Sequence, residues 1–434
     1  MKKTDHIAIL SLFTSLIRVL GGPITILMVS SHLSLEEMGF YYTFFSFIVM
    51  TQLFEVGIGF VLKQFYSHDC KYDDQGVLSK KSLIKSSRLF IFSCQWYIGL
   101  AIIYLVLLIP FSKFYYFNYE GNIEFEGPLL LLLVVTSLKL VSNIIDTYLD
   151  GMQKQIILQK ARLFSSITMS LSLWVLISLD YQLYSIGLSL FLSIQVFVLI
   201  VLYYKKNIDF NIIKEGVNYS FLEQFREIFP LLSRSSLVWF FGYFFWNGFT
   251  LLGFHLYGAS IAGQIGFSIA MAKGGYDVAN SFSVNQRTII ANKIANDKLR
   301  EAIEIFFKYS IFSLSVLTFG YLIIISVKVY LSEFEIVSKM LDTQNLITLF
   351  LFYIFILVMT SVNNFVRSFK IEPFVYLSIY NSTSLMVTFY LSHYWGLKNI
   401  LLLSMIFLIP SLVYSFTFFL KKIGYIKLGI ADVK

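Results

Sequence analysis

The sequence has 434 residues, of which 57% are hydrophobic and only 14% are charged. Soluble proteins carry roughly a quarter charged residues, so this composition excludes a soluble globular protein and indicates an integral membrane protein. The formal net charge of +8 suits contact with anionic lipid headgroups, and binding to nucleic acid is not needed to explain it.

Several kinds of chemical site are excluded by what the sequence lacks. Its two cysteines, Cys70 and Cys94, give neither a disulfide framework nor a metal-binding spacing. The five histidines lie near segment ends and outside metal-ligand spacing of one another. No G-x-x-x-x-G-K-[ST] motif is present, which excludes ATP hydrolysis by this chain. We therefore expect no metal, no cofactor and no enzymatic activity.

Twelve apolar segments are long enough to cross a hydrocarbon core of about 30 Å as helices. In chain order they cover residues 7–29, 39–62, 88–110, 128–149, 161–180, 184–204, 228–252, 261–283, 303–328, 344–366, 372–393 and 398–420. A tight polar turn around Asp180-Tyr181-Gln182 separates the fifth segment from the sixth. The first segment is followed by no signal-peptidase site, so we expect it to be retained as a helix.

The distribution of lysine and arginine predicts the orientation of the chain in the membrane. With twelve spans and the N-terminus inside, 26 of the 34 cations lie in inside segments and four lie outside. The positive-inside rule requires such an asymmetry when the number of spans is right. We therefore expect a multi-pass protein with both termini in the cytoplasm.

A basic stretch in mid-chain, residues 205–228, separates the first six spans from the last six. The expected organisation is an N-terminal six-helix bundle over residues 1–204, a cytoplasmic linker over 205–227, a C-terminal six-helix bundle over 228–420 and a cytoplasmic tail over 421–434. The fold class is thus all-α, with twelve transmembrane helices.

The two halves show weak internal similarity in their charged residues. A slide of 216 residues places Arg18 on Arg234, and a slide of 218 places Glu55 on Lys273. Transporter folds are often built from such repeats, with the substrate site near the bilayer midplane. We therefore expect a parallel repeat, related by an axis along the membrane normal.

Four cations remain after the inside and outside cations are counted, and they are candidate substrate-binding residues: Arg18, Lys139, Arg234 and Lys273. A charge at bilayer depth costs at least ~2.5 to 3.5 kcal/mol on insertion scales and persists where the bundle interior uses it. Arg18 lies at the midplane, and a guanidinium offers paired donors that match phosphate. These cations favour an anionic ligand.

Structural roles for the same cations remain open. Arg18 could form an ion pair with a carboxylate across the bundle, and Arg234 could reach the interface by snorkelling. Lys273 precedes Asp277 by four residues, the spacing of an ion pair within one helix.

Three carboxylates share the spans with these cations: Glu55, Asp146 and Asp277. Each is a candidate coupling site for a proton or sodium ion, or a counter-charge for one of the cations. Asp146 follows Lys139 and Asn143 along one face of the fourth span, and a polar face on an apolar helix is expected to meet protein or water.

Two further groups are candidates for gating or glycan contact. Gly21, Gly22 and Pro23 directly follow Arg18, and this step favours a helix kink that is either a gate or a static bend. In the seventh span, three aromatic residues lie along one face: Trp239, Tyr243 and Trp246. Their rings could stack on sugars, or they could serve packing and interfacial anchoring.

Three stretches resemble a known family of bacterial membrane proteins. They are LSLEEMGFYYTFFSF at residues 33–47, FEVGIGFVLKQFYS at 54–67 and LDGMQK at 149–154. They resemble O-antigen and polysaccharide repeat-unit flippases, the Wzx-like branch of the multidrug/oligosaccharidyl-lipid/polysaccharide (MOP) exporter superfamily. The resemblance implies a MATE-like pair of six-helix bundles around a central, cationic cavity.

The same resemblance implies a function and partners. The substrate would be an undecaprenyl-pyrophosphate-linked oligosaccharide, moved from the cytoplasmic to the periplasmic leaflet of the bacterial inner membrane. The implied partners are this lipid-linked oligosaccharide, membrane lipids, a coupling proton or sodium ion, and other proteins of polysaccharide assembly.

Two alternative functions belong to other classes. An antiporter of drugs or organic cations, from the multidrug branch, would depend on the carboxylates and tolerate loss of Arg18. A membrane-embedded glycan polymerase or ligase would need a catalytic outer surface. The longest outside loops, residues 111–127 and 330–344, are short and carry acids without arginine, so we expect transport.

Overall fold

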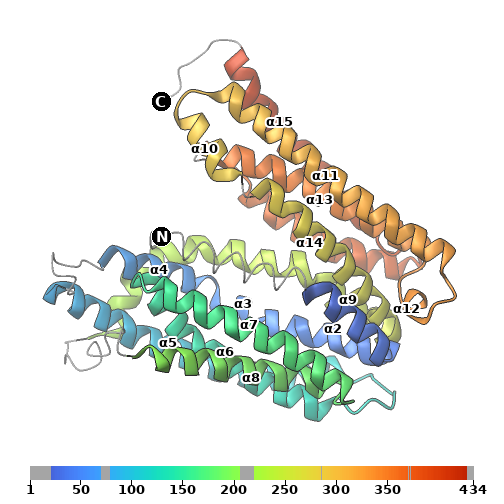
Figure 1. Ribbon diagram of the computed structural model, residues 1–434, viewed down its shortest axis with the longest axis horizontal. Coiled ribbons are helices and arrows are strands. Elements are labelled where there is room, and N and C mark those ends of the chain that lie inside the picture. Colours follow the sequence, from blue (N-terminus) through green and yellow to red (C-terminus); the bar gives the residue numbers. More distant parts are fainter. Residues whose placement is uncertain are drawn as a thin grey trace. The chain divides into compact units, whose positions relative to one another are not determined.

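The computed structural model describes residues 21–69, 79–205, 219–284, 286–369, 371 and 373–427 (Figure 1). Every regular element in these residues is a helix, so the all-α prediction is confirmed. The chain divides into two compact units, Met1–Tyr243 and Phe244–Lys434. This boundary lies inside a helix, whereas the expected boundary follows the linker; the assignment of six spans to each bundle stays a prediction.

Unit 1, Met1–Tyr243, is built around one central helix. A helix runs through residues 21–32 and is followed by α2 (Leu35–Val49), α3 (Thr51–Glu55), α4 (Ile58–Asp69), α5 (Lys80–Tyr115), α6 (Glu126–Gly151), α7 (Gln155–Ser178) and α8 (Tyr184–Tyr203). Of these, α6 packs against α2, α4, α5, α7 and α8. One face of α6, with Leu130, Val134 and Leu138, stays exposed, and its other faces meet protein, so this helix can carry polar side chains on its packed side.

The ninth helix, α9 (Phe221–Val284), has 64 residues and covers the expected seventh and eighth spans. One crossing needs only about 20 residues. Gly258 interrupts the helix with φ 81° and ψ 173°, a conformation that glycine adopts without steric cost. This break coincides with the gap that the hydropathy pattern leaves between residues 252 and 261.

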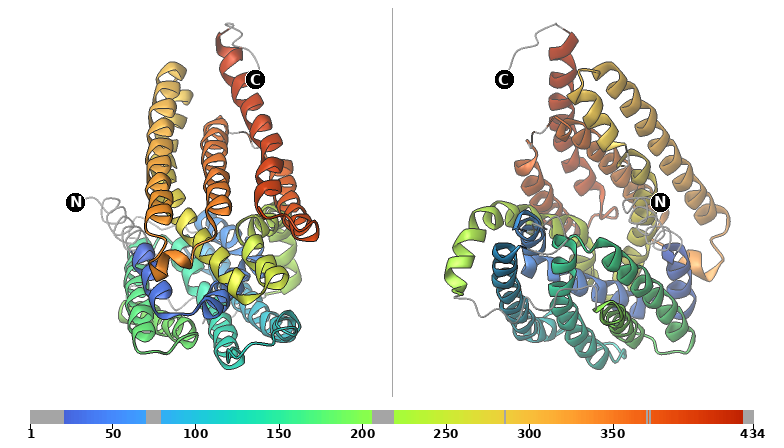
Figure 2. Two further views of the ribbon diagram at one scale, coloured as in Figure 1. Left: turned by 90° about the vertical axis from the view of Figure 1, so that its right-hand side faces the viewer. Right: turned by 60° about the vertical axis from the view of Figure 1, so that its left-hand side comes forward.

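Unit 2, Phe244–Lys434, contains the rest of α9 and six further helices. These are α10 (Arg287–Ala295), α11 (Leu299–Tyr330), α12 (Glu335–Ser338), α13 (Thr343–Arg367), α14 (Val375–Tyr394) and α15 (Leu402–Lys427). Figure 2 shows α13 between α11 and α15, and it packs against both. Among the candidate spans of the described residues, α13 and α6 are the most buried.

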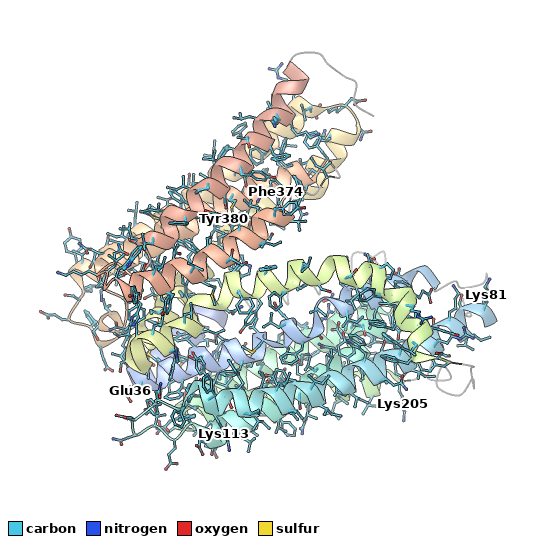
Figure 3. All side chains as sticks on the ribbon, turned by 180° about the vertical axis from the view of Figure 1, so that it is seen from behind. Glu36, Lys81, Lys113, Lys205, Phe374 and Tyr380 are labelled. Atoms are coloured by element: carbon cyan, nitrogen blue, oxygen red, sulfur yellow. The ribbon has the colours of Figure 1, made fainter. Side chains whose placement is uncertain are left out.

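The helices confirm a multi-pass membrane protein. Within the described residues, seven helices are long and apolar enough to cross a membrane, and the bent pair formed by α2–α3 and α4 gives an eighth. Figure 3 shows Lys81 and Lys205 at one end of unit 1 and Glu36 and Lys113 at the other. We call the end with Lys81 and Lys205 the basic end of unit 1.

The LDGMQK stretch forms the turn from α6 to α7 at this basic end. Gly151 is where α4 approaches α6: a Cβ there would lie 2.3 Å from Tyr66 Cβ and 3.2 Å from the Lys63 carbonyl oxygen. Gln153 has a φ of 59°, and the Lys154 N–H donates to the Leu149 carbonyl at 2.9 Å. The motif therefore has a structural role, because it closes α6 and permits tight helix packing.

We predict that Gly151→Ala lowers the free energy of unfolding by about 1–3 kcal/mol, because the added methyl overlaps a packed ring and backbone. Gly99→Ala is the matched control, since a Cβ at Gly99 on α5 meets nothing within 4 Å. Denaturant titration in detergent, followed by tryptophan fluorescence, measures both variants. Equal stabilities for the two variants would contradict the packing role of Gly151.

Candidate functional site

The second span is broken directly after Glu55. Helix α3 ends at Glu55 and α4 begins at Ile58, with a bend of 52° between the two parts of the span. Val56 has a φ of 44° and Gly57 a φ of 81°. A β-branched residue in the left-handed region stores strain of about 1–3 kcal/mol. Broken helices occur at membrane depth only where the backbone is buried in protein or lines a hydrated cavity, and here α3 packs against α5, and α4 packs against α5 and α6.

The Glu55 carboxylate at the break lies near side chains of two neighbouring helices. Asn143 Nδ2 on α6 donates to Glu55 Oε1 at 2.5 Å. The buried Tyr97 on α5 lies close to the same carboxylate. One turn before Asn143, Lys139 places its ammonium 5.3 Å from the centre of the Phe197 ring on α8. The polar face expected on the fourth span therefore meets protein.

Closer to the basic end, Asp146 and Asp150 on α6 share two cations. Arg162 on α7 donates to both Asp146 oxygens, at 2.9 Å and 2.7 Å. Lys63 on α4 lies 3.1 Å from Asp146 and 3.1 Å from Asp150. The bidentate geometry is the strong form of an arginine–carboxylate pair. This ion cluster has two positive and two negative charges, so its net charge is zero.

Asp146 is thus the counter-charge of Arg162 and Lys63. The sequence did not predict either contact. Lys63 and Arg162 lie at the ends of expected spans and belong to the 26 inside cations, so the sequence predicts an orientation role for both. Their pairing with Asp146 depends on helix packing, and no spacing along the sequence indicates it. Whether Asp146 also takes part in coupling stays a prediction.

Unit 2 brings three of the predicted residues together. Lys273 Nζ is 3.0 Å from Asp277 Oδ2, and both side chains are about half exposed. The same ammonium lies 5.8 Å from the centre of the Trp246 ring, which also contacts the ring of Tyr276. The i, i+4 ion pair is therefore present, and it lies beside the Trp246 ring.

The Gly-Gly-Pro step lies at the start of the described residues. Gly21, Gly22 and Pro23 are helical, and the Thr25 hydroxyl donates to the Gly21 carbonyl at 2.8 Å. Trp174 Nε1 on α7 donates to the same hydroxyl at 2.8 Å. This polar link ties the helix to α7, and a Thr hydroxyl bonded to the carbonyl four residues earlier favours a local bend.

The remaining predicted residues have different environments. Tyr243 is 1% exposed and donates to the Ser46 carbonyl at 3.1 Å, so its contacts are those of a packing residue. Trp239 is 42% exposed. Arg18 lies outside the described residues, and for Arg234 the structure describes only a backbone position in α9.

We predict that Asp146 and Arg162 are energetically coupled by about 1–3 kcal/mol, as contacting members of one network usually are. A double-mutant cycle with Asp146→Asn and Arg162→Gln, read out by denaturant titration, measures the coupling. The matched control is the exposed pair Arg300–Glu304, at 3.4 Å on α11, whose coupling is expected to be near zero. Equal coupling in the two pairs would contradict a supporting role for the ion cluster.

Comparison with known proteins finds similarity at the level of structure. No protein-family profile and no curated protein matches the sequence. An inward-facing multidrug resistance MATE family transporter of the MOP superfamily aligns over 96% of both chains, with a TM-score of 0.68 and 13% identity. The lipid II flippase MurJ, in an inward closed conformation, aligns over 96% of this chain and 87% of its own, with a TM-score of 0.63 and 14% identity.

A third solved structure belongs to the same superfamily. It is a MOP superfamily transporter from Pyrococcus furiosus, described as having a binding pocket of reverse polarity. It aligns over 98% of this chain and 96% of its own, with a TM-score of 0.56 and 14% identity. These likenesses show that the chain has the MATE transporter fold of about twelve helices, which confirms the predicted fold class.

Proposed function

We propose that this protein is a flippase for lipid-linked oligosaccharides. Its substrate would be an undecaprenyl-pyrophosphate-linked O-antigen or polysaccharide repeat unit, moved from the cytoplasmic to the periplasmic leaflet by alternating access. The proposed location is the bacterial inner membrane, with both termini in the cytoplasm. The proposed partners are this substrate, membrane lipids, a coupling proton or sodium ion and other polysaccharide-assembly proteins.

This proposal rests on the ion pairs and hydrogen bonds of three carboxylates within the spans. Asp146 is bound by Arg162 and Lys63, and Asp277 is paired with Lys273. Glu55 accepts a hydrogen bond from Asn143. Asp146 and Asp277 thus carry a counter-charge from this chain and Glu55 is hydrogen-bonded, whereas an organic-cation carrier needs a carboxylate whose charge is left for its substrate. This pattern favours an anionic ligand.

The cations would then contact different parts of the substrate. Arg18, at the bilayer midplane, would bind the pyrophosphate through its planar pair of donors. Arg234 and Lys139 would add positive potential. Lys273 and Trp246 would contact the glycan, because a half-exposed ammonium beside an indole face offers one hydrogen-bond donor and one stacking surface.

Glu55 would couple transport to an ion gradient. A proton on its carboxylate turns an acceptor into a donor and changes the hydrogen bond that Asn143 makes to it. Because Val56 next to it is strained, a modest change in this bond can alter the bend between α3 and α4. A sodium ion would act on the same oxygens by competing with Asn143.

A second candidate is an antiporter of drugs or organic cations. The likeness to a multidrug MATE transporter, at a TM-score of 0.68, supports it as strongly as the likeness to MurJ supports a flippase. The two functions differ in their required charges: the antiporter depends on carboxylates, and the flippase depends on Arg18.

We predict that Arg18→Ala abolishes translocation of a polyprenyl-pyrophosphate oligosaccharide, while Arg18→Lys retains part of it, because lysine keeps the charge and loses the bidentate geometry. The assay uses proteoliposomes and follows exposure of the glycan to an external glycosidase. Arg300→Ala, at a surface-exposed cation, is the control and should translocate at the unmodified rate. If the unmodified protein fails to accelerate exposure under several ion gradients, the flippase proposal is wrong.

We predict that Glu55→Gln removes the effect of an ion gradient on the initial rate but leaves gradient-independent translocation in place. Glutamine can still accept the hydrogen bond from Asn143 but can neither ionise nor attract sodium. The measurement compares initial rates with imposed pH and sodium gradients. A variant that responds to both gradients like the unmodified protein would exclude Glu55 as the coupling site.

A further inference from the structure

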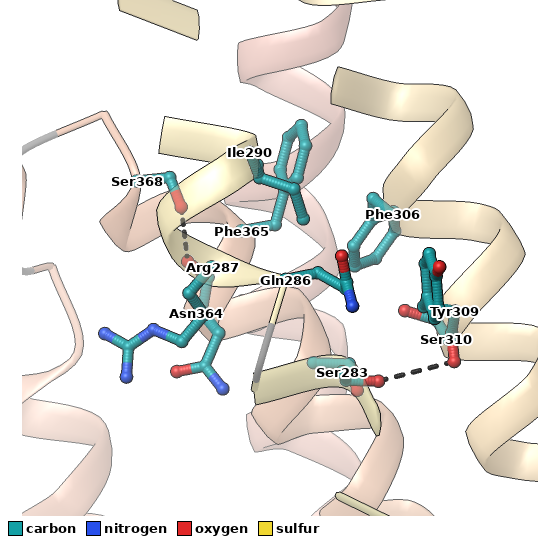
Figure 4. A pocket seen from close by; sticks show the side chains of 11 residues that line it. Ser283, Gln286, Arg287, Ile290, Phe306, Tyr309, Ser310, Asn364, Phe365 and Ser368 are labelled. Atoms are coloured by element: carbon teal, nitrogen blue, oxygen red, sulfur yellow. Dashed lines mark hydrogen bonds between the residues drawn. The ribbon is translucent and has the colours of Figure 1, made fainter. Parts of the chain in front are cut away.

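A small polar pocket lies within unit 2 where α10, α11 and α13 meet (Figure 4). It is formed by the last turn of α9, the start of α10 and neighbouring turns of α11 and α13. Its polar lining includes Ser283, Gln286, Arg287, Tyr309, Asn364 and Ser368, and none of its eleven lining residues is acidic. The transport proposal above uses none of these residues.

Two side chains at the pocket point to a ligand with several acceptor oxygens. Asn364 is only 8% exposed, and among the described residues its side-chain amide has no hydrogen-bond partner. Figure 4 shows this amide beside the side chain of Arg287. Arg287 is exposed and is not ion-paired to any residue that the structure describes. A ligand that bonds to both this amide and the Arg287 guanidinium gains affinity from two donors.

The start of α10 adds backbone donors at the same place. The Ile290 N–H donates to the Gln286 carbonyl at 2.9 Å, so the helix begins next to Gln286. The first N–H groups of a helix have no partners within it, and they lie at the positive end of the helix dipole. Such an end, with nearby guanidinium and amide donors, is suited to phosphate.

The surroundings favour an anion over a cation. Lys308 lies 5.6 Å from the centre of the Tyr309 ring, and Lys422 lies 5.5 Å from that of Phe369, the residue after Ser368. The nearby carboxylate of Glu301 is already paired with Lys293 and Lys298. With Arg287 in the lining and no acidic lining residue, the pocket favours an anion.

We propose that this pocket binds a phosphate group, held at its mouth between the Arg287 guanidinium, the Asn364 amide and the first N–H groups of α10. The empty space, including the open mouth, is about 290 Å³, but the enclosed part has room for only about one water molecule. A phosphate therefore lies at the mouth, with at most one oxygen directed inward. This site is separate from transport, and its failure leaves the proposed function untouched.

The test measures the unfolding temperature of the purified, detergent-solubilised full chain against inorganic phosphate at constant ionic strength. The variants are Arg287→Gln, which changes an exposed side chain, and Asn364→Ala; Arg300→Gln is the control for loss of a surface charge. We expect phosphate to raise the unfolding temperature of the unmodified protein and of Arg300→Gln by a few degrees. Each pocket variant should need about ten times more phosphate for the same rise.

A second arm identifies the source of the phosphate group. Phosphatidylglycerol is added to the micelles and compared with phosphatidylcholine. A rise with phosphatidylglycerol that depends on Arg287 assigns the site to anionic lipid headgroups. A rise with inorganic phosphate alone assigns it to soluble phosphate compounds. If neither probe raises the unfolding temperature, or if Arg287→Gln responds as Arg300→Gln does, the site does not exist.

Discussion

A carboxylate within a membrane-spanning bundle needs a cation or several donors from the same chain, and Asp146 meets this requirement through Arg162 and Lys63. Because these residues lie on α6, α7 and α4, the ion cluster fixes three helices of unit 1 against one another at the basic end. The close approach of α4 to Gly151 lies beside it. With α4 and α6 held in this way, Asn143 comes opposite Glu55, and the bend after α3 is supported from α6.

Span positions could be predicted from sequence because hydropathy is a local property of the chain. The expected fourth span, 128–149, corresponds to α6 at Glu126–Gly151. The expected polar turn around Asp180 is present, with Asp180 and Gln182 at positive φ. The i, i+4 pair of Lys273 and Asp277 was also expected, since helical spacing alone brings the two side chains together.

Features that depend on tertiary contacts could not be predicted. The break at Val56 and Gly57 lies inside an expected continuous span, 39–62, because its polar neighbours come from α5 and α6, far along the chain. The sequence predicts only an orientation role for Lys63 and Arg162. Their contact with Asp146 could not be predicted, because it depends on the packing of α4 and α7 against α6. Nothing in the sequence distinguishes Tyr97 from the other tyrosines, of which the chain has 28 in total. The pocket at α10 likewise depends on how three helices meet.

The charged residues of the spans fall into two classes, carboxylates and cations. Asp146, Asp277 and Glu55 are each bound by side chains of this chain, and under the proposed function Arg18 serves the anionic substrate. Equilibrium binding of two ligand classes to the same purified protein, undecaprenyl pyrophosphate and a lipophilic organic cation such as tetraphenylphosphonium, tests this division most directly. We expect the pyrophosphate lipid to bind, and the organic cation to bind no better than it does to empty micelles. Tight binding of the cation that is lost in Glu55→Gln or Asp277→Asn would contradict the account and favour an antiporter.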